Sequence, residues 1–281
     1  MTSRTVAVEH RSPRAPGRVT AALDGIVTLW YRDLLRFFRD RSRIVGSFAQ
    51  PLLYLFIFGS GLSASMGRLG GAGLSYVQFI FPGIVSMTVL FTAIFSAVSI
   101  IWDREFGFLK EILVAPIPRW SLAVGKALGR STTAMLQGVL MLSFAPLVGV
   151  SLAPRLVLAL LPLIFLTAFA LSSLGLLVAA RMRSLEGFQL VMNFLMMPIF
   201  FLSGALFPLN NLPGWLTVFT RLDPAAYGVD AIRHVTLPGA GPALGLTLFG
   251  HPMTPLTDAL VVLAFGALMI ALAVRAFQTQ E

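Results

Sequence analysis

The sequence predicts an all-α integral membrane protein with six transmembrane helices. Three observations support this fold class. The 281 residues are 57% hydrophobic and only 12% charged, with a mean hydropathy of +0.84, whereas a soluble chain would be about a quarter charged. Six segments approach the roughly 20 apolar residues that a helix needs to cross a bilayer. The basic residues gather in a few connecting segments, as membrane orientation requires.

The residues before the first predicted span divide into two parts. Residues 1–19 hold four arginines and no apolar core. They therefore lack the pattern of a signal peptide, and we expect a disordered, basic cytoplasmic tail. In residues 20–43 the apolar side chains recur at helical spacing, with arginines and aspartates between them. This pattern predicts an amphipathic helix in the membrane interface, because no soluble domain is predicted on which it would pack.

Residues 44–281 form the predicted transmembrane domain. Its spans are predicted at about 44–62, 76–101, 127–150, 156–180, 188–207 and 257–274. We expect these spans to be uncharged, with no functional Asp, Glu, Lys, Arg or His inside them. That expectation argues against proton antiporters, rotary-type pumps and channels with charged pores, all of which need such groups.

The distribution of lysine and arginine predicts the orientation of the spans. Nine of the 21 basic residues lie in residues 1–43 and five in 102–130, whereas the opposite side holds only four, Arg68, Arg155, Arg221 and Arg233. Because positive charge stays on the cytoplasmic side, both termini are predicted to be cytoplasmic. The arginine bias is typical of a GC-rich genome, and we expect a multi-pass protein of a bacterial cytoplasmic membrane.

Several kinds of chemistry find no support in the sequence. The Gly125–Lys126 pair is not embedded in a phosphate-binding loop motif, so ATP is not expected to bind this chain. His234 and His251 lack a carboxylate at metal-ligand spacing along the chain, so no metal site is expected. The chain has no cysteine, and no basic segment is interleaved with aromatic residues as in a nucleic-acid-binding module. We therefore expect no catalytic residue, no cofactor and no nucleic-acid partner.

Residues 102–119, WDREFGFLKEILVAPIPR, concentrate charge between two apolar segments. Phe106, Leu109 and Leu113 recur at helical spacing, and the pattern stops at Pro116 and Pro118, because proline ends a helix. A plain solvated loop would not need so many large apolar residues. We therefore predict a short cytoplasmic helix held at the membrane, which presses on a protein partner and offers it charged groups at Arg104, Glu105, Lys110 and Glu111.

The same segment resembles the first cytoplasmic loop of type-2 ABC transporter permeases. Matching positions are Glu105, Gly107, Leu109, Lys110, Leu113 and Pro116, while Ala115 departs from the commoner Ser or Thr. The stretch MMPIFFLSGALFPLNNLPGWL is similar to that family's fifth span and its exit, and LDPAAYGVDAIR at 222–233 is similar to its external segment before the last span. The subgroup that exports drugs and natural products, typified by daunorubicin-resistance permeases, is the most similar.

The resemblance implies partners and a coupling site. Two permeases, either identical copies or paralogues, would pair in the lipid bilayer, and each would dock a separate ABC ATPase that binds the ATP and magnesium. The coupling helix seated in that ATPase would contain Arg104, Glu105, Phe106, Gly107, Leu109, Lys110 and Leu113. A second, smaller cytoplasmic contact would contain Arg181, Arg183 and Glu186.

The resemblance also implies a path and a gate. The path would run between the two permeases, and its candidate residues are Phe79, Phe91, Asn193, Phe194, Met197 and Phe201. Short external re-entrant helices within 208–237 would form an outer gate, with Pro208, Leu212, Pro213 and Tyr227 as its candidate residues.

Three functions remain open at this stage. The leading hypothesis is an exporter permease for a hydrophobic or amphipathic drug, natural product or lipid, because the spans are rich in Phe and Met. One alternative is export of a polysaccharide or lipid-linked glycan, although a sugar path would favour more Trp and Tyr than the four of each present. Another alternative is a membrane scaffold without transport, which would not need the coupling segment.

Overall fold

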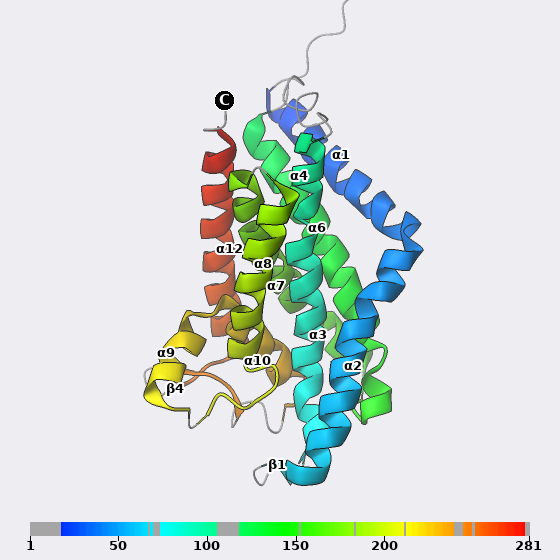
Figure 1. The fold of residues 1–281 in the computed structure, drawn as a ribbon, viewed down its shortest axis with the longest axis vertical. Coiled ribbons are helices and arrows are strands. Elements are labelled where there is room, and N and C mark those ends of the chain that lie inside the picture. The colour runs from blue at the N-terminus through cyan, green and yellow to red at the C-terminus, as the bar shows by residue number, and fades with distance from the viewer. Residues whose placement is uncertain are drawn as a thin grey trace, which may run out of the picture.

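A computed structural model shows a bundle of long helices (Figure 1). The structure describes residues 18–66, 68–69, 74–105, 118–151, 153–182, 184–210, 212–238, 244–248 and 251–278. The predicted all-α class is confirmed over these residues, since the only strands among them are two-residue pieces. The antiparallel pairs are β1 (Arg68–Leu69) with β2 (Leu74–Ser75), and β3 (Thr247–Leu248) with β4 (His251–Pro252).

The helices follow one another along the chain with short connections. In order they are α1 (Arg18–Arg39), α2 (Arg41–Met66), α3 (Tyr76–Phe95), α4 (Val98–Glu105), α6 (Arg119–Leu142), the 3-10 helix η1 (Ala145–Val148), α7 (Pro154–Arg181), α8 (Leu185–Leu202), α9 (Gly214–Leu222), α10 (Pro224–Thr236) and α12 (Pro255–Gln278).

The bundle has two distinct ends. The C-terminus, α4 and the start of α1 lie together at one end, whereas β1, α9 and β4 lie at the other (Figure 1). We call these the C-terminal end and the distal end.

Within the part of the chain that the structure describes, five helices are long and apolar enough to cross a membrane. They cover Ile44–Ser63, Tyr76–Glu105, Pro154–Arg181, Leu185–Leu202 and Pro255–Gln278, and they correspond to five of the six predicted spans. The remaining prediction, 127–150, falls on α6 and η1. Because α6 carries Lys126 and Arg130, it is less apolar than the other five, and the count of six spans stays a prediction.

Helix boundaries differ from the predicted ones for local reasons. The amphipathic helix ends at Arg39, and α2 begins at Arg41, three residues earlier than predicted. The second span bends at Ser96–Ala97 and continues as α4 to Glu105. The fifth span stops at Leu202, because Gly204 adopts a left-handed φ of 70° that a helix cannot accommodate. Most of the predicted disordered tail, residues 1–17, lies outside the described residues.

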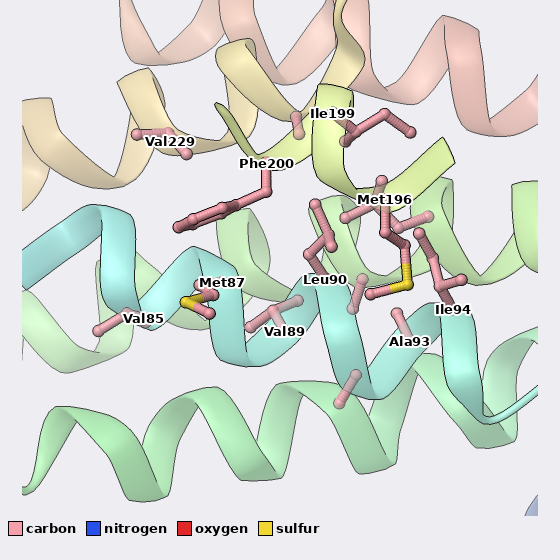
Figure 2. Packing of buried hydrophobic residues seen from close by; sticks show 14 of the residues in the cluster. Val85, Met87, Val89, Leu90, Ala93, Ile94, Met196, Ile199, Phe200 and Val229 are labelled. Carbon is pink, nitrogen blue, oxygen red and sulfur yellow. The ribbon is translucent and has the colours of Figure 1, made fainter. Parts of the chain in front are cut away.

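Helix α3 lies at the centre of the core. It packs against α2, α6, α7 and α10, and its side chains from Phe79 to Leu90 are almost entirely buried. Figure 2 shows the ring of Phe200, from α8, lying between α8 and α3 above Met87. The close fit depends on Gly83, where a Cβ atom would come within 2.4 Å of the Ala205 carbonyl oxygen.

The expectation of uncharged spans is wrong. Arg130 lies inside the third predicted span and Asp258 inside the sixth, and both are buried, with exposures of 2% and 0%. Arg130 donates a hydrogen bond to the Ser99 hydroxyl at 2.9 Å. Ionisable groups persist in membrane helices when they face other helices and not lipid. The charge content of the spans therefore does not exclude ion-coupled carriers.

Candidate functional site

The predicted coupling segment leaves the bundle at the C-terminal end. Phe106, Gly107, Leu109, Lys110 and Leu113 lie outside the described residues, but the helices that hold both ends of the segment are described. On one side is the last turn of α4, where Glu105 is exposed. On the other is the first turn of α6, which follows Pro118.

Arg104 joins the end of α4 to the end of α7. Its guanidinium donates to the Met182 carbonyl oxygen at 2.5 Å and to the Ala180 carbonyl oxygen at 3.3 Å. The last carbonyl groups of a helix have no partner within the helix, and a cation there also complements the helix dipole. Arg104 thereby links the predicted coupling segment to the end of α7, where the second cytoplasmic contact is predicted. Arg181 and Glu186 are exposed beside this junction, whereas Arg183 lies outside the described residues.

Arg119 makes an equivalent junction on the other side of the segment. From the first residue of α6 it donates to the carbonyl oxygens of Phe277 and Gln278, at 3.5 and 3.2 Å, at the end of α12. Both helices that flank residues 106–117 are therefore anchored to the C-terminal ends of other helices. A force applied to the segment would reach α7 and α12 through these two arginines.

A buried ionic cluster lies just inside this end. Lys126 of α6 contacts the Asp103 carboxylate of α4 at 2.5 Å, and Arg32 of α1 lies 3.9 Å from the same carboxylate. Sequence reasoning missed this cluster. The available signal was Lys126, one of only two lysines, placed among small and apolar residues. The cluster joins α1, α4 and α6.

Helix α1 packs closely along α6 beside this cluster. The Trp30 indole donates to the Thr132 hydroxyl at 3.0 Å. At Gly125 a Cβ atom would lie 3.1 Å from the Ile26 backbone, and at Gly129 it would lie 3.0 Å from the Asp33 side chain. The face of α1 that contains Ala22 and Leu29 is buried, while Leu23 and Val27 are exposed. One face of α1 therefore packs on α6, and another face exposes an apolar strip. Its place in the membrane interface stays a prediction.

A cavity of about 870 Å³ opens between α1, α3, α4 and α6 near the cluster. Its lining mixes charged, polar and aromatic groups: Asp33, Arg36, Phe37, Asp40, Ser42, Thr92, Phe95, Ser96, Val98, Ser99, Trp102, Asp103, Arg130, Thr133, Gln137 and Gln189. None of the six predicted path residues is among these lining residues. The cavity includes the bend between α3 and α4, so movement of α4 would change its shape.

The predicted path residues separate into two groups. Phe79 is fully buried, and its ring lies 4.3 Å from the Arg233 guanidinium carbon. Phe91 is half-buried against the rings of Phe95 and Phe200. The other four lie on the outer face of α8, where Asn193, Phe194, Met197 and Phe201 are exposed. This outer face of α8 is therefore available to lipid, to cargo or to a second copy.

The predicted gate residues lie around α9 and α10 at the distal end. Pro208 and Leu212 are half-buried, and Pro213 is exposed immediately before α9. Tyr227 is buried and donates its hydroxyl to the Arg221 carbonyl oxygen at 2.8 Å.

Asp223 separates these two short helices and caps α10. Its carboxylate accepts a hydrogen bond from the Ala225 backbone N–H at 2.9 Å. Burial raises the pKa of Asp223 to about 8, although the bond from Ala225 acts in the opposite direction. The cap therefore favours the protonated carboxyl at neutral pH.

Comparison with known proteins identifies the family. The family model described as ABC-2 type transporter matches residues 24–237, which is most of the chain. The chain belongs to this family. Two relatives are nodulation protein J of Rhizobium meliloti (strain 1021), 32% identical over 75% of this chain and 80% of that protein, and nodulation protein J of Sinorhizobium fredii (strain NBRC 101917 / NGR234), 29% identical over 79% and 85%. A putative transport permease, ycf38 of Cyanophora paradoxa, is 30% identical over 68% of this chain and 66% of that protein.

Membership of the ABC-2 family gives the geometry a context. It makes the chain a multi-pass transport permease that works with an ABC ATPase, and it indicates no catalytic enzyme family. The daunorubicin-resistance subgroup is not confirmed by these relatives. The assignment of individual residues to coupling, path and gate stays a prediction.

Proposed function

We propose that this chain is the permease subunit of an ATP-driven exporter that moves a hydrophobic or amphipathic molecule out across a bacterial cytoplasmic membrane. Both termini would be cytoplasmic, so the C-terminal end would face the ATPase. ATP and magnesium would bind the ATPase, while this permease would pair with a second permease to enclose the path.

The anchoring of residues 106–117 is the observation that supports this function best. Glu105 is exposed at the end of α4, while the neighbouring Arg104 is bonded to the end of α7. An ATPase that pulls on the segment would therefore move α4 and α7 together. Because α4 continues α3, which lies at the centre of the core, this motion would reach the middle of the bundle. A scaffold without transport would not need such a linkage.

The outer face of α8 supports an amphipathic cargo. Phe194 is 82% exposed and Met197 48% exposed, with Asn193 beside them as a polar group. A second permease facing this helix would enclose a largely apolar surface. Export of a polysaccharide or lipid-linked glycan is the second candidate. A lipid-linked form would still use the apolar surface, whereas a free polysaccharide would not.

The test is association of the full chain with its ABC ATPase, followed by ATP hydrolysis in lipid nanodiscs. We expect Glu105→Lys and Gly107→Trp to reduce association by about tenfold or more, because the first reverses a charge and the second adds bulk within the predicted contact. Arg155→Glu is the matched control, since it changes an exposed charge by the same amount at the distal end. It should bind like the wild type.

Two results would count against the coupling assignment. One is wild-type association and hydrolysis in both variants, and the other is equal loss in Arg155→Glu.

A second experiment tests the class of cargo. The rate of ATP hydrolysis by the complex in vesicles is measured with each candidate cargo added. An amphipathic lipid or a lipid-linked glycan should stimulate hydrolysis, whereas stimulation by free polysaccharide alone would reject the apolar path.

A further inference from the structure

Three metal-ligating side chains converge at the distal end. Asp230 and His234 lie one turn apart on α10, and Asp258 lies in the first turn of α12. One ligand atom from each residue lies within 4.8 Å of those from the other two. The two carboxylates are fully buried, and the imidazole side chain is 7% exposed. Sequence reasoning overlooked Asp230, four residues before His234, and could not place Asp258, which becomes their neighbour only when α10 packs on α12.

Hydrogen bonding fixes the orientation of the histidine. His234 Nδ1 lies 2.9 Å from the Asp230 backbone carbonyl oxygen, an atom that can only accept. Nδ1 therefore carries a proton, which in the neutral imidazole leaves the lone pair on Nε2. Nε2 is buried and has no hydrogen-bond partner among the described residues. Donation of the other ring N–H to a backbone carbonyl is the arrangement usually found behind a metal-bound histidine.

The two carboxylates also have buried oxygens without a hydrogen-bond partner among the described residues. Asp230 Oδ2 accepts from the Leu246 backbone N–H at 3.0 Å, whereas Oδ1 lies 3.6 Å from His234 Nδ1 and has no hydrogen-bond partner in the described part of the chain. Neither oxygen of Asp258 has a partner among the described residues. With both carboxyls ionised, the four free atoms are all acceptors and cannot satisfy one another, so the cluster needs either a bound cation or a shared proton. Leaving such groups buried and unpaired costs about 1–3 kcal/mol each, and more when they are charged. A cation would supply what all four lack.

The cationic side chain next to His234 along α10 is engaged elsewhere. Arg233 is adjacent on α10 and fully buried, but it donates to the Gly204 carbonyl oxygen at 2.6 Å, and its guanidinium lies over the Phe79 ring. No salt bridge joins it to either aspartate among the described residues. Segment 244–248 closes the other side, because a Cβ atom at Gly245 would come within 2.4 Å of Asp230 Oδ1.

We propose that Asp230, His234 and Asp258 form a binding site for a divalent transition metal ion, with Zn²⁺ as the best-fitting ion. One imidazole and two carboxylates suit zinc, which binds such ligands at about 2.0–2.2 Å. Calcium and magnesium prefer six or more oxygen ligands, so the histidine disfavours them. Ligand atoms around a tetrahedral zinc ion lie about 3.3–3.6 Å apart, so these atoms, which lie within 4.8 Å of one another, would move closer together on binding. The bound ion would fix α10 to the first turn of α12 and so hold the distal end of the last span.

The test is metal binding by the full chain in detergent, purified through an affinity tag without histidine and stripped with a chelator. Zn²⁺ is titrated in competition with a chromophoric chelator, and Co²⁺ is added separately to record its visible spectrum. We expect about one Zn²⁺ per chain and an intense four- or five-coordinate Co²⁺ spectrum. His234→Gln and Asp258→Asn should weaken binding by about 100-fold or more. His251→Gln removes the exposed histidine of β4 and should bind like the wild type.

The Co²⁺ spectrum of the wild-type chain keeps the proposal testable even if a variant fails to fold. The chain contains no cysteine, so thiolate bands cannot confuse that spectrum. Stoichiometric binding that His234→Gln leaves unchanged would overturn the proposal. Wild-type Zn²⁺ affinity in the Asp258→Asn variant would also overturn it. If that variant were in addition more stable than the wild type, the cluster would hold a shared proton and not a metal ion. The result is independent of the ATPase, so failure here would leave the proposed transport function standing.

Discussion

Lys126 and Asp103 show how this fold keeps ionic groups inside a mostly apolar bundle. Lys126 is 1% exposed and its amine contacts the Asp103 carboxylate, which also faces Arg32. Removing charges from water is costly, and the attraction between them only offsets that cost when the pair is intact. The intact pair therefore adds little to the free energy of unfolding, whereas loss of one member lowers it strongly. Asp103 also lines the cavity and lies two residues before the end of α4.

Lys126→Met is expected to destabilise the protein by about 3–5 kcal/mol, because it leaves the buried Asp103 carboxylate without its closest partner. Asp103→Asn/Lys126→Met should recover most of that loss, since neither remaining group is charged. The measurement is reversible unfolding in mixed micelles, arranged as a double-mutant cycle with both single variants. Additive losses in the double variant would show that the two side chains act separately.

Sequence patterns predicted the long apolar helices well and the polar details poorly. Helices α7 and α12 begin and end within a few residues of their predicted spans, because each is an apolar run between clear breakers. The start of α6 was predicted eight residues too late, because its first two turns hold polar groups that are buried only when α1 and α4 cover them. The proposed metal site at α10 and α12 was missed only in part for the same reason. Asp258 reaches it through packing, whereas the i, i+4 spacing of Asp230 and His234 was visible in the sequence.

At the scale of the helices, Gly83 determines how closely α3 approaches the segment after α8. A Cβ atom there would lie 2.4 Å from the Ala205 carbonyl oxygen and 2.5 Å from its Cα atom. Backbone cannot rotate away as a flexible side chain does, so we expect Gly83→Ala to cost about 1–3 kcal/mol and lower the thermal unfolding midpoint.

Gly46→Ala is the matched control for this experiment, because nothing lies within 4 Å of the added methyl group in α2. Alanine favours a helix over glycine by about 1 kcal/mol, so this variant should match or exceed the wild-type midpoint. Equal midpoints for the two variants would mean that α3 is not held as tightly as the contact implies.

At the scale of the whole molecule, the number of crossings depends on α6. Its first residue bonds to the end of α12, whereas beyond η1 the Gly149 carbonyl oxygen accepts from Gln78 at the start of α3. Helix α6 and η1 therefore run from the C-terminal end to the distal end. The charges that make α6 less apolar are turned inward, where Lys126 meets Asp103 and Arg130 meets Ser99. Lipid would contact the remaining, uncharged faces, so we expect α6 to cross the membrane as a sixth span.

Single cysteines in this cysteine-free chain test that count without background labelling. Leu147 in η1 is 76% exposed and Trp120 in the first turn of α6 is 43% exposed. In intact cells a membrane-impermeant maleimide should label Leu147→Cys and should reach Trp120→Cys only after permeabilisation, because the two positions lie at opposite ends. Thr254→Cys and Gln278→Cys mark the distal and C-terminal ends as controls, since both residues are exposed. If Leu147→Cys and Trp120→Cys instead react from the same side, α6 does not cross and the molecule has five spans. The predicted coupling segment, which precedes α6, and the end of α12 would then lie on opposite sides of the membrane. Only one of them could face the ATPase.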